Sequence, residues 1–286
     1  MNSKTNGWLS GLTGVVIFAG SLPATRLAIA NFSPLFLTSA RATLAAVAAL
    51  LLLALWQPQR PRQADLFSLI MVAAGVVIGF PLLTALALQK ISAAHSLMYV
   101  GLLPLCTAIF AVIRGERRPQ PAFWLFSLAG GIIVTGYALA AKENQAGWQD
   151  LLMVAAVILC AAGYAEGASL ARRLGGWQTI AWSLCLSLPV TLPTAVLSRP
   201  TSFNSVSLFA WVGLGYVALF SMLIGFIFWY RGLAKGGTAA VGQLQLLQPF
   251  IGFGFAALLL NESISGAMVV STFGALCCVA GAKRFG

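Results

Sequence analysis

Apolar residues occur along the chain in long blocks that are separated by short polar connections. Each block holds about 20 residues, the length with which a helix crosses a hydrocarbon core of about 30 Å. The pattern predicts ten transmembrane helices, and no strands, because an open sheet edge cannot be satisfied in lipid. Glycine ends several of these helices, as at Gly175 and Gly237. The predicted helices are 7–29, 34–56, 64–89, 93–113, 121–141, 148–171, 177–197, 206–231, 238–260 and 264–282.

The fourth block of the series has a second copy in the ninth block. Both copies begin with an Ala-Ala pair, contain a proline and end near a glutamate, and their outer markers are 146 residues apart. A repeat with an odd number of spans must insert upside down relative to its twin, as in many transporters. We therefore expect residues 1–141 and 148–286 to form two inverted five-helix repeats within a single membrane domain. The markers are Ala93, Pro104 and Glu116 in the first copy and Ala239, Pro249 and Glu262 in the second.

The composition and the distribution of charge agree with a membrane protein. Charged residues make up 8% of the chain, against about 25% in soluble domains, and 59% of the residues are hydrophobic. With a cytoplasmic N-terminus, twelve of the 17 Lys and Arg residues fall on the inner side, as the positive-inside rule requires. We therefore expect a multi-pass membrane protein with both termini in the cytoplasm. This topology and anionic lipid headgroups account for the net charge of +11 without a nucleic-acid partner.

Polar side chains occupy one face of each duplicated helix. His95 and Tyr99 are four residues apart and share a helix face. At the corresponding face of the second copy lie Gln245 and Gln248. Polar side chains are costly when they face lipid, so we expect these groups to point into the protein. We interpret them as substrate contacts in a central cavity; hydrogen bonding across the helix bundle is the alternative.

A second symmetric pair extends this candidate site. Ser21 in the first predicted helix corresponds to Tyr164 in the sixth, and each follows an Ala-Gly pair. We include both among the predicted substrate-binding residues. Most other aromatic residues in the spans are interpreted as packing or as anchors at the membrane interface.

The charged residues within the spans are interpreted separately. Glu166 lies about two helical turns before Arg173 on the same face, which predicts an ion pair near the cytoplasmic end. A proton-coupling role for Glu166 is the alternative. Arg26 and Arg41 are expected off-centre, where they line an outer vestibule or pair with backbone carbonyls.

The sequence gives little support for catalysis, metal binding or cofactors. The chain has one histidine, its six carboxylates are scattered, and it contains neither a nucleophile elbow nor a phosphate-binding glycine loop. The five cysteines lie in apolar segments without the spacing of metal ligands, which is typical of small buried hydrophobic residues. We therefore predict that the protein is not an enzyme and uses neither a cofactor nor a metal.

Several of these features together resemble a known superfamily. The Ala-Ala…Pro…Glu signature of both fourth helices, the two five-helix halves, and Pro34 with Arg41 in the second helix are similar to the drug/metabolite transporter superfamily. The similarity extends over essentially the whole chain. It is greatest to the ten-helix bacterial exporters of amino acids and related metabolites, with aromatic amino-acid exporters as a subgroup. A Trp-Gly pair often found in the first helix of each half is replaced here by Ala-Gly, at 19–20 and 162–163.

This resemblance implies an exporter of a bacterial inner membrane that works by alternating access around a central cavity. A neutral, hydrogen-bonding lining would suit an amino acid with an aromatic or other apolar side chain, whereas sugar phosphates would require cations in the cavity. A proton-coupled exporter of cationic drugs is the first alternative and would need a central carboxylate, for which Glu166 is the candidate. A structural membrane protein without transport activity is the second. The expected partners are a small-molecule substrate and membrane lipid, and a monomer is consistent with the sequence.

Overall fold

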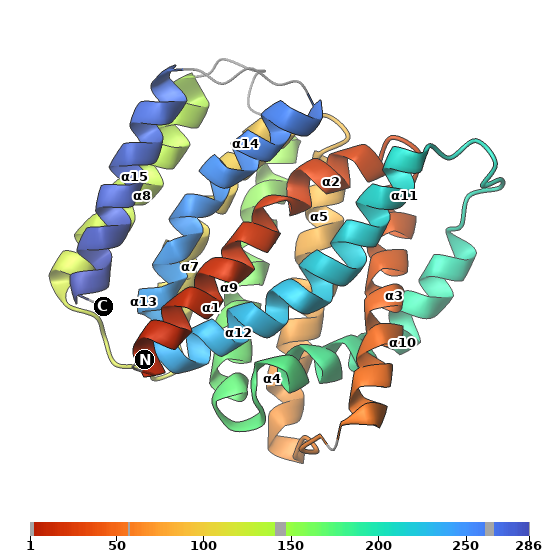
Figure 1. Cartoon of the computed structure of the whole chain (residues 1–286), viewed down its shortest axis with the longest axis horizontal. Coiled ribbons are helices and arrows are strands. Elements are labelled where there is room, and N and C mark those ends of the chain that lie inside the picture. Colours follow the sequence, from red (N-terminus) through yellow and green to blue (C-terminus); the bar gives the residue numbers. More distant parts are fainter. Residues whose placement is uncertain (1–2, 57, 141–146, 261–265, 286) are drawn as a thin grey trace.

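The regular elements of the protein are all helices in the part of the chain that the structure, a computed structural model, describes: residues 3–56, 58–140, 147–260 and 266–285 (Figure 1). Two elements, η1 and η4, are 3₁₀-helices, and two, η2 and η3, are π-helices. Up to residue 140 the elements are α1 (Ser3–Ala19), α2 (Ser21–Ala28), α3 (Pro34–Leu55), η1 (Gln63–Asp65), α4 (Leu66–Val72), η2 (Ala73–Gly79), α5 (Phe80–Ala87), α6 (Ala93–Val100), α7 (Leu103–Ile113) and α8 (Pro121–Ala140). From residue 148 they are α9 (Trp148–Leu174), α10 (Gly176–Leu197), α11 (Leu208–Gly215), η3 (Tyr216–Ile224), α12 (Gly225–Gly236), α13 (Thr238–Gly242), η4 (Gln243–Leu247), α14 (Gln248–Leu260) and α15 (Gly266–Phe285).

Seven helical stretches within the described residues are long and apolar enough to cross a membrane. The stretch predicted at 93–113 is divided between α6 and α7, and those predicted at 121–141 and 264–282 correspond to α8 and α15. The all-helical, multi-span architecture is thus confirmed, whereas the count of ten spans stays a prediction. The seven stretches are Thr5–Ala28, Pro34–Leu55, Gln63–Ala87, Trp148–Leu174, Gly176–Leu197, Leu208–Gly236 and Thr238–Leu259.

The glycines that were predicted to end helices do so. α9 ends immediately before Gly175, and α12 ends immediately before Gly237. The φ angles of these glycines are 90° and 91°, a region that residues with a side chain rarely adopt. A glycine at each position therefore lets the chain leave one helix and enter the next within a single residue.

Elements from the two halves of the chain pack against each other. α1 packs along α12, and α9 packs against α4, η2 and α5. α3 packs against α10, and α8 lies beside α15 (Figure 1). Because every one of these pairs joins the first half to the second, the large hydrophobic core contains side chains of both halves, from Val15 to Val279.

Glycines allow two of these pairs to approach closely. Where α1 meets α12, a Cβ atom added to Gly232 would lie 2.6 Å from the backbone nitrogen of Gly11. Where η2 meets α9, a Cβ atom on Gly75 would collide with the carbonyl oxygen of Leu159. In a bilayer, helices associate through close backbone packing of this kind, because lipid is as apolar as the helix surfaces.

We predict that Gly75→Ala lowers the thermal stability of the detergent-purified protein. The added methyl group must push α9 away from η2, and overpacking of this kind costs about 1–3 kcal/mol. The matched control is Gly215→Ala, since a Cβ atom there meets nothing within 4 Å. Thermal unfolding followed by circular dichroism should show a lower midpoint for Gly75→Ala alone. Equal midpoints for the two variants would contradict the packing described for η2 and α9.

Candidate functional site

Four departures from regular α-helix meet at one buried cavity. Ser21 follows the break between α1 and α2, Val76 lies in η2, Ser221 lies in η3, and Gln248 follows η4. Such irregular stretches often occur at functional sites. The space open to water-sized groups is about 30 Å³, which is room for roughly two of them. The lining residues are Phe18, Ser21, Leu22, Thr25, Arg41, Val76, Phe80, Pro81, Thr84, Cys160, Tyr164, Ser221, Phe226 and Gln248.

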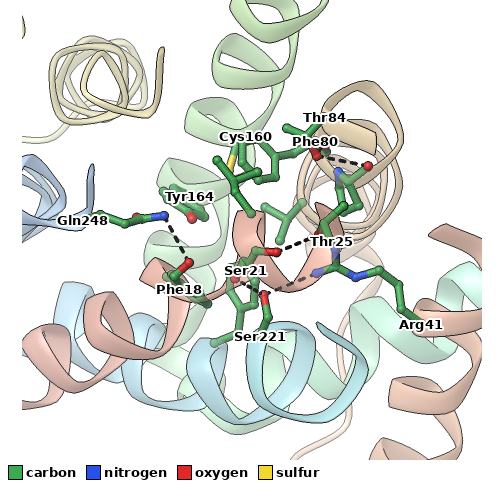
Figure 2. Close-up of a pocket in the computed structure, with 14 residues that line it drawn as sticks. Phe18, Ser21, Thr25, Arg41, Phe80, Thr84, Cys160, Tyr164, Ser221 and Gln248 are labelled. Atoms are coloured by element: carbon green, nitrogen blue, oxygen red, sulfur yellow. Dashed lines mark hydrogen bonds between the residues drawn. The ribbon is translucent and has the colours of Figure 1, made fainter. Parts of the chain in front are cut away.

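Hydroxyl groups and a guanidinium form a polar wall of this cavity (Figure 2). The hydroxyls of Ser21 and Ser221 are hydrogen-bonded to each other at 2.6 Å. Arg41 Nη2 donates to Ser221 Oγ at 3.3 Å, and Thr25 Oγ1 donates to the carbonyl of Ser21 at 2.7 Å. The polar wall therefore joins α2 and α3 of the first half to η3 of the second.

The position of Arg41 corrects the expectation that it lies off-centre. Pro34 and the N-cap residue Ser33 begin α3, and about two turns further the helix buries Arg41 against η3. Arg41 is 5% exposed and lines the cavity. Arg26 differs, because it donates a hydrogen bond to the carbonyl of Leu88 and is not part of the lining.

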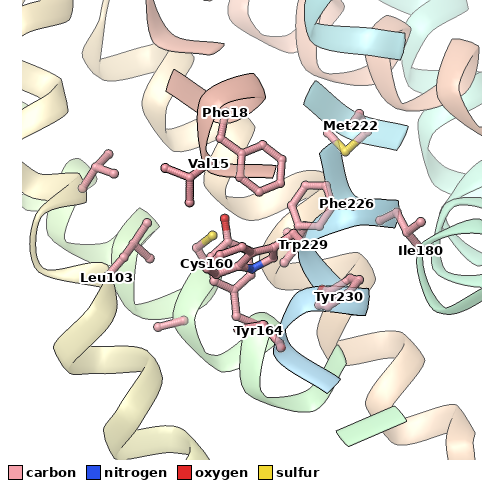
Figure 3. Close-up of a cluster of buried hydrophobic side chains, with 14 of the residues drawn as sticks. Val15, Phe18, Leu103, Cys160, Tyr164, Ile180, Met222, Phe226, Trp229 and Tyr230 are labelled. Atoms are coloured by element: carbon pink, nitrogen blue, oxygen red, sulfur yellow. The ribbon is translucent and has the colours of Figure 1, made fainter. Parts of the chain in front are cut away.

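Aromatic rings supply the apolar part of the lining and continue into the core (Figure 3). The ring centroids of Phe18 and Phe226 are 4.7 Å apart, and those of Tyr164 and Phe226 are 5.8 Å apart. Trp229, which is fully buried, lies 5.5 Å from the ring of Tyr164. Rings at these separations form a rigid surface that favours contact with another apolar or aromatic group.

Buried amides approach the cavity from η4 and the start of α14. Gln248 Nε2 donates to the carbonyl of Phe18 at 3.5 Å, while its Oε1 has no hydrogen-bond partner. Gln245 is fully buried, and its side chain lies within hydrogen-bonding reach of Tyr164. Because a buried polar group without a partner is costly, Gln248 Oε1 is suited to bind a ligand that supplies the missing hydrogen bond.

The whole chain is similar to a known family of membrane proteins. Residues 5–141 and 147–282 each match the family described as EamA-like transporter family. The chain belongs to the EamA-like transporter family. It is 54% identical over 285 residues to a Bacillus subtilis (strain 168) protein named Uncharacterized transporter YdeK, covering 100% of this chain and 99% of that one.

More distant similarities agree with this assignment. A second Bacillus subtilis (strain 168) protein, Uncharacterized transporter YyaM, is 20% identical over 249 residues, covering 84% of this chain and 82% of that one. A crystal structure of another protein shares the fold with a TM-score of 0.78 at 17% identity, covering 98% of this chain and 97% of that one. The family match and the similarity to YdeK show that this EamA-like protein is a multi-pass membrane transporter of the superfamily suggested by its sequence.

The structure does not bring His95 and Tyr99 of this EamA-like protein to the cavity. His95 Nε2 lies 2.8 Å from Asp150 Oδ1, near the start of α9. Tyr99 faces the same carboxylate, and its ring centroid is 5.8 Å from that of His95. Of the residues predicted from the sequence, the cavity is lined by Ser21, Tyr164 and Gln248, and Gln245 contacts Tyr164.

Near its other end α9 carries Glu166, whose partner differs from the predicted one. Arg114 Nε lies 2.7 Å from Glu166 Oε1, and Ser68 donates to Glu166 Oε2 at 2.7 Å. The expected partner, Arg173, pairs instead with Asp65. Arg173 extends toward η1, whereas α7 brings Arg114 alongside the buried carboxylate.

A further ion pair connects the same end of α9 to Glu116, which follows α7. Arg172 Nη1 lies 2.7 Å from Glu116 Oε1, which also accepts a hydrogen bond of 2.6 Å from the hydroxyl of Thr238. Glu116 thus joins the end of the first duplicated segment to the start of the second. Its predicted counterpart, Glu262, lies outside the described residues.

Arg41 was not among the residues predicted from the sequence to belong to the site, yet it lines the cavity. The available signal was a charge two helical turns inside an apolar segment, which is a functional candidate by default. The polar faces of the fourth helix in each half were the more prominent signal in the sequence. Within the described ranges, no three His, Cys, Asp or Glu side chains gather as metal ligands.

We predict unequal effects on stability when the two partners of the Glu166–Arg114 pair are changed singly. The Glu166 side chain is 7% exposed and that of Arg114 is 41% exposed. Arg114→Gln leaves a buried carboxylate unpaired, whereas Glu166→Gln leaves a cation that can reach water. We expect Arg114→Gln to lower the free energy of unfolding by about 3 kcal/mol, the low end of the range for breaking a buried pair. We expect Glu166→Gln to lower it by only about 1 kcal/mol, because the remaining cation is partly exposed.

The measurement is thermal or denaturant unfolding of the two single variants and the double variant. The double variant should be more stable than Arg114→Gln alone, because it removes the unpaired carboxylate. Additive losses, or a greater loss in Glu166→Gln than in Arg114→Gln, would contradict the pairing.

Proposed function

We propose that this EamA-like transporter exports amino acids or related small metabolites, preferably neutral ones with an aromatic side chain, across a bacterial inner membrane. The observation that carries the proposal is a buried cavity with a hydrogen-bonding wall and an aromatic wall, built by elements of both halves. Hydrogen-bonding groups suit the polar end of an amino acid, and the rings of Phe18 and Phe226 suit its side chain. The outward direction of transport is proposed from the resemblance to bacterial exporters.

The size of the cavity supports transport by alternating access. A space of about 30 Å³ is too small for a whole amino acid, so binding requires the surrounding helices to separate. Contacts suited to closing the two sides lie at the two ends of α9. Near its start Asp150 meets His95, and towards its end Glu166 meets Arg114.

The proposal includes ten spans in two inverted halves, with both termini in the cytoplasm. The pairing of elements supports it, because exchanging the halves converts the α1–α12 contact into the contact of α9 with α4, η2 and α5. The π-helical stretches support it as well, since η2 and η3 occupy corresponding places in the third and eighth predicted helices.

An exporter of cationic drugs fits the cavity less well. Its lining contains the cation Arg41 and no acidic residue. Glu166, the candidate for proton coupling, is engaged by Arg114 and Ser68 and is not part of the lining. Membership of a transporter family disfavours a purely structural role.

We predict that the purified protein in liposomes exchanges radiolabelled phenylalanine for unlabelled phenylalanine trapped inside. Counterflow of this kind needs no ion gradient, so the assay does not depend on the coupling ion. The controls are protein-free liposomes and a panel of small neutral and charged amino acids. The idea fails if no amino acid exchanges while a quaternary ammonium dye is driven by a pH gradient and Glu166→Gln abolishes that movement.

A second prediction concerns Gln248 in the same assay. Gln248→Ala removes the unpartnered Oε1 from the lining, and the loss of one neutral hydrogen bond should lower the exchange rate about threefold to tenfold. Gln120→Ala is the matched control, since Gln120 is exposed at the start of α8. Exchange at the wild-type rate by folded Gln248→Ala would exclude Gln248 as a substrate contact.

A further inference from the structure

The guanidinium of Arg41 is a buried positive charge whose Nε has no hydrogen-bond partner. Nη2 donates to Ser221 at 3.3 Å, but Nε has no partner. Nε and Nη2 form one side of the planar guanidinium, and this side is the fork that binds a carboxylate through two parallel hydrogen bonds. Figure 2 shows the guanidinium directed at Ser221 within the cavity.

No acidic side chain among the described residues balances this charge. Each of the four described carboxylates pairs with a different basic residue, and none of them lines the cavity. A buried charge without a counter-ion is strongly disfavoured, so an anionic group is bound more favourably here than in water. The pairs are Asp65 with Arg173, Glu116 with Arg172, Asp150 with His95 and Glu166 with Arg114.

We propose that Arg41 binds a carboxylate group of the transported molecule through Nε and Nη2, assisted by the hydroxyls of Ser21 and Ser221. This inference rests on the transport function proposed above and specifies the charge of the substrate. The two serine hydroxyls now share one hydrogen bond of 2.6 Å, and either can turn its proton to the incoming carboxylate.

The cavity favours a carboxylate over a phosphate. Its lining contains a single cationic group, the guanidinium of Arg41, whereas a phosphate carries more charge and three or four oxygens that need donors. Gln248 Oε1 adds an unpartnered acceptor to the same lining, which suits an ammonium or hydroxyl group close to the carboxylate. The chemical class is therefore a monocarboxylate with an apolar side chain, such as an α-amino or α-hydroxy acid.

The test compares three probes of similar shape on the detergent-purified full-length protein. These are 3-phenylpropionate, its neutral amide 3-phenylpropionamide, and the cation phenethylamine. The acid should raise the midpoint of thermal unfolding in a concentration-dependent manner, because it binds only the folded state. The amide and the amine should need at least tenfold higher concentrations to raise the midpoint by the same amount. Equal effects of acid and amide, or an equal effect of inorganic phosphate, would overturn the proposal.

Substitutions of Arg41 separate ligand binding from a structural role. Arg41→Met should abolish the effect of the acid, and Arg41→Lys should weaken it at least tenfold, because an ammonium lacks the planar fork. Without ligand, Arg41→Met should unfold at the wild-type temperature or above, since it removes an uncompensated buried charge. A lower midpoint together with an unchanged response to the acid would show that Arg41 only braces Ser221.

The matched control is Arg26→Met, which removes a cation that contacts the carbonyl of Leu88 outside the cavity. It should retain the full response to 3-phenylpropionate. If Arg41→Met does not fold, Ser221→Ala decides the matter: it should weaken acid binding about threefold to tenfold and leave the response to the amide unchanged. An unchanged response to the acid in folded Ser221→Ala would count against the site.

The two proposals can fail separately. Stabilisation by the acid that depends on Arg41, without exchange of any amino acid, would retain the carboxylate site and overturn the amino-acid exporter. Amino-acid exchange that Arg41→Lys leaves unchanged would retain the exporter and overturn the role of Arg41.

Discussion

Within a bilayer every backbone N–H and C=O group must be hydrogen-bonded inside the protein, and the rest of this structure depends on that constraint. It makes the apolar blocks helical and confines departures from the α-helix to the interior. Those departures, the break after α1 and the stretches η2, η3 and η4, surround one cavity. The carbonyl of Phe18, which accepts from Gln248, shows how irregular backbone there becomes part of a polar contact. A polar site thus arises where the helices are least regular.

Much of the fold could be predicted because its signals are local. The lengths of the apolar blocks indicated the helices, and Gly175 and Gly237 indicated two of their ends. The correspondence of the two halves also predicts that Ser21 and Tyr164 lie close together, and both line the cavity. Such a correspondence identifies positions that are equivalent by symmetry, and the cavity lies where the two halves meet.

What could not be predicted depends on which helices are neighbours. Arg173 lies on the same helix face as Glu166, yet Arg114 from another helix is its partner. In the same way, Asp150 engages His95 across 55 residues of sequence and keeps it from the cavity. Arg41 was discounted as a site residue because its distance from η3 is a property of tertiary packing. These contacts change the electrostatics of the site from neutral to cationic, and hence the kind of molecule that it favours.

The arrangement of charges on α9 has a consequence for how the protein responds to its surroundings. The helix is held at its start through Asp150 and towards its end through Glu166, Arg172 and Arg173. Because α9 is one continuous helix of 27 residues, a displacement at one end is transmitted along it to the contacts at the other end. Arg114 and Arg172 are each 41% exposed, so dissolved ions can screen the contacts at one end far more than buried ones. Added salt should therefore weaken the contacts of Arg114 and Arg172 more than the contact between His95 and Asp150 at the start of α9, where both side chains are 15% exposed.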